Sequence, residues 1–112
     1  MRVAGAFAEY VVVPEQSLLS VPDDMDVAQA SLTEPTAVSL HSILLAERAL
    51  HRPVSEARAL VIGAGAIGVL AALILQSKGC SDVYIGDTGE LRRKTAEKNG
   101  FGHVYDLSLI HI

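Results

Sequence analysis

The pattern of apolar and polar positions along the first third of the chain predicts short extended segments separated by turns. Between Gly5 and Val13, β-branched and aromatic side chains run up to Pro14, which predicts a strand. A second short strand is predicted over Leu18–Val21, which lies among prolines and turn-forming residues.

Two helices are predicted next, because capping residues and a proline precede apolar stripes of helical period. Asp23 or Asp24 can cap a short helix over residues 25–32. Proline suits the first turn of a helix, so Pro35 begins a longer helix that runs to Leu50 along a broad apolar stripe.

From residue 59 onward, strand-like and helix-like segments alternate. The predicted elements are a strand over 59–62, a helix over 66–78, a strand over 82–86, a helix over 90–99 and a third strand starting at 103. The continuous apolar run of the first of these strands predicts burial on both of its faces. The β-α-β-α-β order predicts an α/β fold with a parallel sheet and right-handed crossovers.

The uncharged stretch Ala59–Leu75 has a second interpretation, as a segment that enters a membrane. As one helix it would span about 25 Å, short of the roughly 30 Å hydrocarbon core. Glycines interrupt it, and the flanking Arg58 and Lys78 give no charge asymmetry to orient it. We therefore expect no membrane association.

Length and charge narrow the remaining classes. The 112 residues, half of them apolar, suffice for one domain and are too few for two well-buried ones. The net charge is −4 and no strong basic run occurs, so we expect no nucleic-acid partner. The single cysteine, Cys80, can form neither an internal disulfide nor a cysteine zinc cluster, and no secretory signal opens the sequence; a cytoplasmic protein is expected.

Three glycines with the spacing GxGxxG, Gly63, Gly65 and Gly68, lie between a predicted strand and a predicted helix. The first glycine allows the tight turn, the second lets backbone approach a pyrophosphate, and the third lets helix and strand pack closely. The helix N-terminus would then face the phosphates. The alternative is a glycine turn in an α/β protein that binds nothing, and the motif favours dinucleotide binding.

An acidic residue strengthens this interpretation. Asp87 follows the second predicted strand, about 20 residues after Gly68, where a carboxylate accepts hydrogen bonds from the adenosine ribose. Such a carboxylate repels a 2′-phosphate, so the sequence favours NAD over NADP. The nearby Arg92 and Arg93 weaken this preference, because arginines can accept a phosphate.

The segments "GAFAEYVVVP", "VPDDMDVAQASLTEPTAVSLHSI" and "ARALVIGAGAIG" together resemble the zinc-dependent medium-chain dehydrogenases, within their polyol and threonine dehydrogenase branch. The resemblance implies that residues 1–50 are the end of a GroES-like catalytic domain with its connecting helix. Residues 51–106 would be the N-terminal half of a Rossmann NAD-binding domain, that is, the first half of its parallel sheet.

The resemblance also implies site residues, none of them catalytic. Glu34 would ligate zinc, although a carboxylate there could instead only complement a helix dipole. Val38 would lie near the nicotinamide, or in plain core; Ile67 would offer an amide to the pyrophosphate and Arg92 would flank the adenosine. The implied NAD contacts are Gly63, Gly65, Ala66, Ile67, Gly68, Asp87, Arg92 and Val38.

Expected parts of such an enzyme are missing, including an upstream cysteine ligand, a Gly-His-Glu segment and the later strands of the Rossmann domain. A zinc site normally needs three protein ligands, so Glu34 alone would not hold the metal. The sequence is therefore interpreted as an internal fragment that is inactive by itself. Its residues 107–112, "LSLIHI", resemble a translated sequencing-library adaptor, the alternative being a natural apolar strand.

The resemblance implies that the whole enzyme oxidises a small-molecule alcohol, polyol or amino alcohol. Hydride would pass to NAD, with zinc as the second cofactor. Members of the family are commonly dimers or tetramers, which implies a homodimer or homotetramer. Two alternatives stay open: a zinc-free quinone or enone reductase of the same superfamily, and a non-catalytic dinucleotide-binding module.

Overall fold

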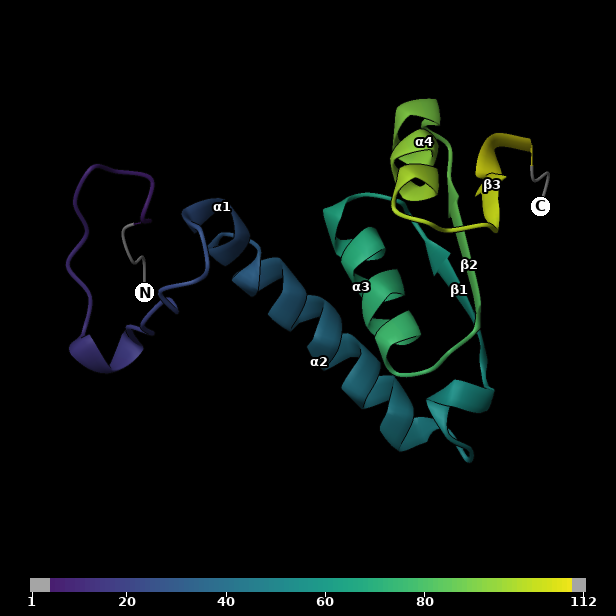
Figure 1. Cartoon of the computed structure of the whole chain (residues 1–112), viewed down its shortest axis with the longest axis horizontal. Coiled ribbons are helices and arrows are strands. Elements are labelled where there is room, and N and C mark those ends of the chain that lie inside the picture. Colours follow the sequence, from purple (N-terminus) through teal and green to yellow (C-terminus); the bar gives the residue numbers. More distant parts are fainter. Residues whose placement is uncertain (1–4, 110–112) are drawn as a thin grey trace. The chain divides into compact units, whose positions relative to one another are not determined.

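The computed structural model describes residues 5–109 (Figure 1). The chain divides into two compact units, one up to Ala30 and one from Ser31 onward. None of the helices that the structure describes is long and apolar enough to cross a membrane.

In the first unit, the strands predicted over Gly5–Val13 and Leu18–Val21 do not form, so both predictions are wrong. A strand needs a neighbour to pair its backbone N–H and C=O groups, and the described residues of this unit offer none. Instead, this part of the chain holds only a 3-10 turn at Glu15–Ser17 and the short helix α1 at Val27–Ala30. Every described side chain before Ala30 is exposed to solvent.

The cap of α1 also differs from the prediction. Asp26, and not Asp23 or Asp24, accepts a hydrogen bond from the amide of Gln29 at 2.8 Å. The Gln29 side chain accepts one in return from the amide of Asp26 at 3.3 Å. This reciprocal pair is a capping box, and it begins the helix later than predicted because the cap lies later.

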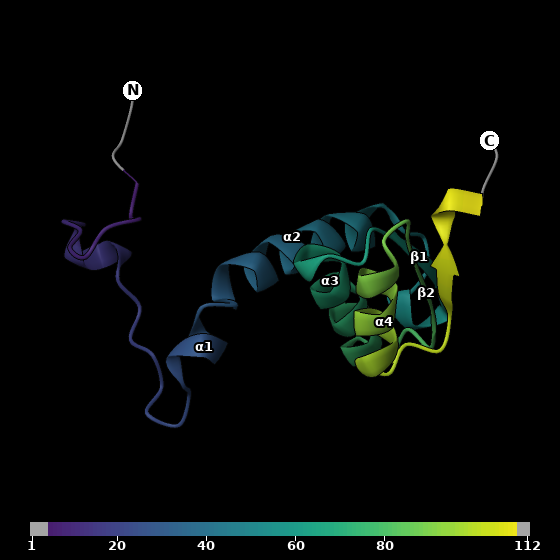
Figure 2. The ribbon, with the colours of Figure 1, turned by 90° about the horizontal axis from the view of Figure 1, so that it is seen from above.

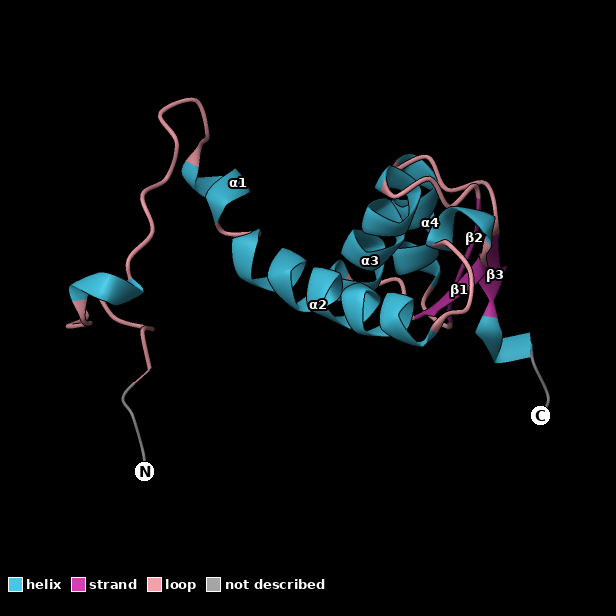
Figure 3. Ribbon diagram, turned by 90° about the horizontal axis from the view of Figure 1, so that it is seen from below, coloured by secondary structure: helices cyan, strands magenta, loops and turns pink. Residues whose placement is uncertain are grey.

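The second unit contains a three-stranded parallel sheet and three longer helices, as predicted (Figure 3). The elements are α2 (Thr33–Ala49), β1 (Arg58–Ile62), α3 (Ala66–Ser77), β2 (Asp82–Asp87), α4 (Glu90–Lys98) and β3 (Val104–Asp106), with 3-10 turns at Val54–Glu56 and Leu107–Leu109. The strand order is β1-β2-β3, so each crossover helix connects neighbouring strands. Gly79 and Gly100 have positive φ angles just after α3 and α4, which stops both helices.

The helices of this unit gather on one side of the sheet (Figure 2). The core between them is formed mainly by small and β-branched side chains, with Ile85 of β2 fully buried. Leu60 and Ile62 of β1 point to the other face and are exposed. The prediction that this strand is buried on both faces is therefore wrong, because the described chain covers only one face of the sheet.

Polar contacts join α2 to both ends of α3. Near the start of α2, the buried Ser39 hydroxyl lies within hydrogen-bond distance of the carbonyl oxygen of Ile67, at 3.1 Å. Near its end, Lys78 Nζ donates to both carboxylate oxygens of Glu47 at 3.0 Å. These contacts hold α2 alongside α3, and the contact of Ser39 lies at the beginning of α3, next to the glycine turn.

In the tail, residues 107–109 form a 3-10 turn rather than a strand. The side chain of Leu107 packs over Gly86, where a Cβ atom would lie 2.7 Å from Leu107 Cδ2. The last three residues of the predicted non-native segment lie outside the described part of the chain.

Candidate functional site

The three glycines form the turn between β1 and α3, and each has a different environment. Gly63 has φ +103°, and its amide donates to the carbonyl oxygen of Gly86 at 2.7 Å. A Cβ atom on Gly68 would lie 1.7 Å from the carbonyl oxygen of Gly63, so helix and turn touch directly. A Cβ atom on Gly65 would meet no atom within 4 Å. The turn is thus tight at two glycines and open to a ligand at the third.

Asp87 ends β2 beside this turn, and only 5% of it is exposed. Its Oδ2 accepts a hydrogen bond from the amide of Ala64, inside the turn, at 2.9 Å. Its Oδ1 accepts from the amide of Gly89 at 2.7 Å. The Gly89 and Ala64 amides hold the pKa of the Asp87 carboxyl below its usual value, with Arg92 adding a smaller effect and burial opposing them. Asp87 is therefore a charged carboxylate that fixes the turn to the end of β2.

Arg92, in the first turn of α4, contributes a mostly exposed positive charge to this site. Its side chain is 67% exposed, and Nη1 lies 3.6 Å from Oδ2 of Asp87. A cavity of about 420 Å³ opens between these residues and the glycine turn. Its lining comprises Val61, Ile62, Gly63, Gly65, Ala66, Ile67, Gly68, Ala71, Asp87 and Arg92. All of the predicted cofactor contacts except Val38 therefore line one cavity.

The residues present fit a dinucleotide at this position. The first amides of α3 have no acceptor within their own helix, and a helix N-terminus attracts phosphate. Open space lies in front of Gly65, where a pyrophosphate would come close to the backbone. A charged carboxylate lies at the end of the neighbouring strand, at the distance along the chain that ribose recognition needs.

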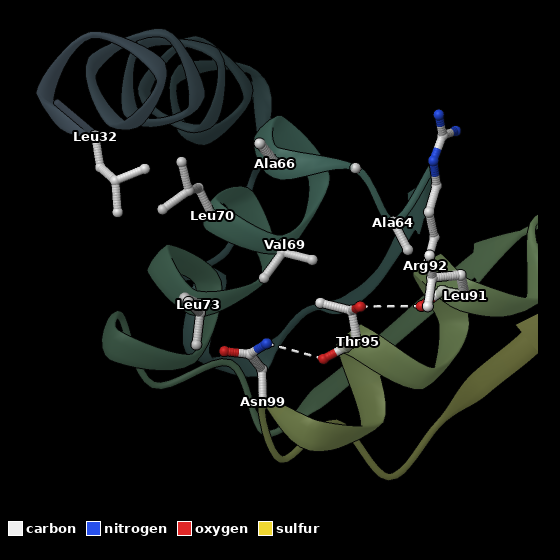
Figure 4. A pocket seen from close by; sticks show the side chains of 11 residues that line it. Leu32, Ala64, Ala66, Val69, Leu70, Leu73, Leu91, Arg92, Thr95 and Asn99 are labelled. Carbon is white, nitrogen blue, oxygen red and sulfur yellow. Dashed lines mark hydrogen bonds between the residues drawn. The ribbon is translucent and has the colours of Figure 1, made fainter. Parts of the chain in front are cut away.

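A second, apolar groove of about 480 Å³ runs between α3 and α4 and reaches the start of α2 (Figure 4). It shares Ala64, Gly65, Ala66 and Arg92 with the first cavity. Figure 4 shows Leu32 and Leu70 turned toward each other. Two polar side chains of the groove bond to the backbone of α4: Thr95 donates to Leu91 O at 2.9 Å and Asn99 donates to Thr95 O at 2.8 Å. Apart from the mostly exposed Arg92, the groove thus offers mainly apolar contact.

The two remaining predicted site residues, Glu34 and Val38, lie on α2 and do not line the cavity. Both are exposed. Glu34 lies in the first turn of α2, a position that also suits a carboxylate that only complements the helix dipole. Between residues 5 and 109, no three side chains of His, Cys, Asp or Glu come together as a metal site. The described residues therefore do not form a zinc site by themselves.

Sequence reasoning missed three polar contacts that build this site. They are the bond from the Ala64 amide to Asp87, the contact of Ser39 with Ile67, and the bonds from Arg93 to the backbone after β2. Ser39 could have been suspected, because a small polar residue interrupts the apolar stripe of its helix. The other two depend on which backbone groups the fold leaves unpaired, and no local pattern reports that.

No family model matches the chain. Individual known proteins are nevertheless similar to it over most of its length. The chain is 39% identical over 103 residues to a probable (R)-acetoin-forming diacetyl reductase of Saccharomyces cerevisiae. It is 35% identical over 104 residues to an L-threonine 3-dehydrogenase of Mesorhizobium japonicum. These matches cover 92% and 93% of this chain but only 23% and 28% of the relatives, so the chain spans about a quarter of their length.

A solved structure agrees with the sequence comparison. The galactitol-1-phosphate dehydrogenase of Escherichia coli matches 96% of this chain and 30% of its own, with a TM-score of 0.80 and 29% identity. The similarity extends over nearly the whole chain and includes the predicted α/β half-sheet. It confirms both the predicted fold class and the predicted resemblance to a segment of a longer enzyme.

Proposed function

We propose that this chain, which is similar to segments of an L-threonine 3-dehydrogenase and a galactitol-1-phosphate dehydrogenase, belongs to the medium-chain dehydrogenases and holds the adenosine and pyrophosphate half of NAD. The observation that carries the proposal is Asp87, a buried carboxylate bonded to the amide of Ala64 within the glycine turn. One group thereby fixes the phosphate-binding turn and presents charged oxygen to the ribose. The turn and the ribose-binding group are set in place before any ligand arrives.

In this proposal the chain's residues divide the binding between them. The amides at the start of α3, including that of Ile67, donate to the pyrophosphate, and Gly65 leaves room for it. Asp87 accepts hydrogen bonds from the ribose hydroxyls, and Arg92 flanks the adenosine. NAD, when bound, supplies a nicotinamide that accepts a hydride from the substrate.

The choice of NAD over NADP rests on charge. The carboxylate of Asp87 would repel a 2′-phosphate, and the Gly89 and Ala64 amides that lower its pKa favour this charged form. Of the two arginines that could have accepted that phosphate, Arg93 is already bonded to two backbone carbonyls and to Asp106. Of these two arginines, Arg92 alone is free to turn toward a 2′-phosphate. The charges at the site therefore favour NAD over NADP.

For the enzyme as a whole we propose a dehydrogenase that acts on a small alcohol, polyol or amino alcohol. The relatives named for such activities support this, over the quarter of their length that is matched. Residues 1–50 would belong to the catalytic part and residues 51–106 to the NAD-binding part. Glu34 stays a proposed zinc ligand and Val38 a proposed nicotinamide neighbour; the metal would need further ligands from other segments.

The proposal is tested by titrating the chain with NADH and with NADPH while following the fluorescence of the reduced nicotinamide. We expect NADH to bind at least about tenfold more tightly, a difference of ~1.4 kcal/mol. Asp87→Asn should weaken NADH binding. It should also reduce the difference in affinity between NADH and NADPH, because an amide does not repel the 2′-phosphate.

The matched control is Asp82→Asn, at the opposite end of the same strand, where the carboxylate pairs with Arg58. This variant should bind NADH as the wild type does. Failure of the wild type to bind NADH, or equal binding by Asp87→Asn, would contradict the proposed function.

A further inference from the structure

Arg93 makes three polar contacts at the carboxyl ends of the strands. Its Nη1 donates to the carbonyl oxygens of Asp87 at 2.9 Å and Thr88 at 2.8 Å. Its Nη2 lies 2.7 Å from Oδ2 of Asp106, at the end of β3. Only 17% of the side chain is exposed, although it stands on a helix whose other charged residues mostly face solvent.

These contacts need the shape of a guanidinium. Its rigid fork of donors can serve two carbonyls and a carboxylate at once, whereas an ammonium is a point charge on a flexible stem. The three acceptors lie at the ends of two neighbouring strands, since Asp87 and Asp106 are paired in register. Arg93 thus bonds the chain where it leaves β2 and ties that point to β3.

We propose that Arg93 is the positioning residue for the ribose-binding carboxylate. The bonds from Arg93 hold the backbone of Asp87 and Thr88, and this backbone sets the direction of the Asp87 side chain. With the backbone held, Oδ2 meets the Ala64 amide and Oδ1 meets the Gly89 amide. The inference rests on the proposed dinucleotide binding for its purpose, but its geometry can be tested without a ligand.

The adjacent arginines then have different tasks. Arg92 is mostly exposed, 3.6 Å from Asp87, and free to adjust to a bound nucleotide. Arg93 touches the backbone of Asp87 rather than its carboxylate, and its neighbours leave it no freedom to follow a ligand. Arg93 acts through Asp87 and is expected to make no contact with the cofactor.

The first test measures hydrogen exchange of backbone amides by NMR in the 112-residue chain and in Arg93→Lys, which keeps the charge but loses the fork. We expect protection of the Ala64 and Gly89 amides to fall about tenfold, as for the loss of one hydrogen bond. The amide of Lys78, bonded to Ile74 O at the far end of α3, should keep its protection.

Two matched variants separate positioning from plain stabilisation. Lys94→Gln removes a charge from the next residue of α4, which pairs with Glu90 four residues before it, and should change none of these amides. Asp106→Asn removes the ion pair with Arg93 but leaves the two carbonyl bonds, so it should have a smaller effect than Arg93→Lys. Unchanged protection at Ala64 in Arg93→Lys, or an equal loss at Lys78, would overturn the proposal.

A second readout links the residue to the ligand. Arg93→Lys should weaken NADH binding several-fold and binding of inorganic pyrophosphate less, because pyrophosphate depends on Asp87 only through the turn that its carboxylate holds, whereas NADH also contacts the carboxylate itself. Equal weakening of both ligands would contradict a role through the ribose carboxylate. If the wild type binds no NADH, the proposed function fails, and the exchange experiment still decides whether Arg93 positions Asp87.

Discussion

Residues 5–30 and residues 31–109 have similarly apolar stretches, yet they differ sharply in structure. Val11, Val12 and Leu19 are exposed in the first unit, whereas Val83 and Ile85 of β2 are buried in the second. The difference lies in pairing: β2 has a strand on each side and helices over one face, while the described part of the first unit contains no strand at all. Apolar β-branched sequence forms a strand only where a neighbour accepts its hydrogen bonds.

Among the variants that test this comparison, a substitution in the glycine turn is expected to cause the largest loss of stability. Gly68→Ala would place a Cβ atom 1.7 Å from the carbonyl oxygen of Gly63, and backbone cannot move aside as a flexible side chain can. We expect the second unit to lose more than about 3 kcal/mol of stability, beyond the usual cost of overpacking. Urea unfolding followed by circular dichroism measures this loss.

The control for that variant is Gly102→Ala, in a loop after α4 where a Cβ atom meets nothing within 4 Å and φ is not positive. It should unfold at the same urea concentration as the wild type. Similar urea midpoints for Gly68→Ala and Gly102→Ala would show that the turn moves to accommodate the added Cβ atom. That result would contradict the close packing of α3 against the turn.

A slightly smaller effect is expected from truncating the core. Ile85→Ala removes a fully buried side chain from β2 and should cost about 3 kcal/mol, within the range of such cavities. Leu19→Ala, in the first unit, removes an exposed side chain and should change stability by less than about 0.5 kcal/mol. Comparable losses from the two variants would mean that the first unit buries this leucine in solution.

Ser39→Ala tests the attachment of α2 to α3. The hydroxyl lies 2.9 Å from Pro35 O and 3.1 Å from Ile67 O in a buried position, so its loss should cost about 1 kcal/mol. Ser42→Ala is the matched control, because the Ser42 hydroxyl bonds to Val38 O within its own helix and is exposed. Equal denaturation midpoints for Ser39→Ala and Ser42→Ala would show that the contact between the helices adds nothing.

The smallest effect is the dependence on pH. Hydrogen bonds from the Gly89 and Ala64 amides lower the pKa of Asp87, and the bond from Arg58 lowers that of Asp82, each from 3.8. A carboxyl whose pKa is lower in the folded chain than in the unfolded chain stabilises the fold. This stabilisation is fully present above the unfolded-state pKa and is lost as the pH falls through the folded-state pKa. The urea midpoint of the second unit should therefore hold at neutral pH and drop below about pH 4. A midpoint that rises on acidification would contradict these contacts.

Local signals predicted the second unit well. The predicted helix over 66–78 ends within a residue of α3, because Gly79 takes a positive φ there. The spacing of Gly63, Gly65 and Gly68 located the turn, and Asp87 was placed beside it by its distance along the chain. Each of these features is encoded within a few residues of where it acts.

What could not be predicted depends on partners distant in sequence. The strand expected at 5–13 required a neighbour, and the exposed face of Leu60 and Ile62 required knowing what covers the sheet. The engagement of Arg93 with the carbonyls of Asp87 and Thr88 follows from backbone that the fold leaves unpaired. Sequence reasoning named Arg92 as a cofactor contact and saw in Arg93 only a second charge that could accept a phosphate, so the backbone bonds of Arg93 emerge from the structure alone.

The central claim is that the glycine turn and Asp87 form a ready site for NAD, and Gly65→Val tests it most directly. Gly65 has an ordinary φ of −76° and open space around it, so the variant should fold with the urea midpoint of the matched Gly102→Val. The new side chain would occupy the space of the pyrophosphate. We predict that a fluorescence titration shows NADH binding for the wild type and Gly102→Val but none for folded Gly65→Val. Undiminished NADH binding by Gly65→Val would contradict the account.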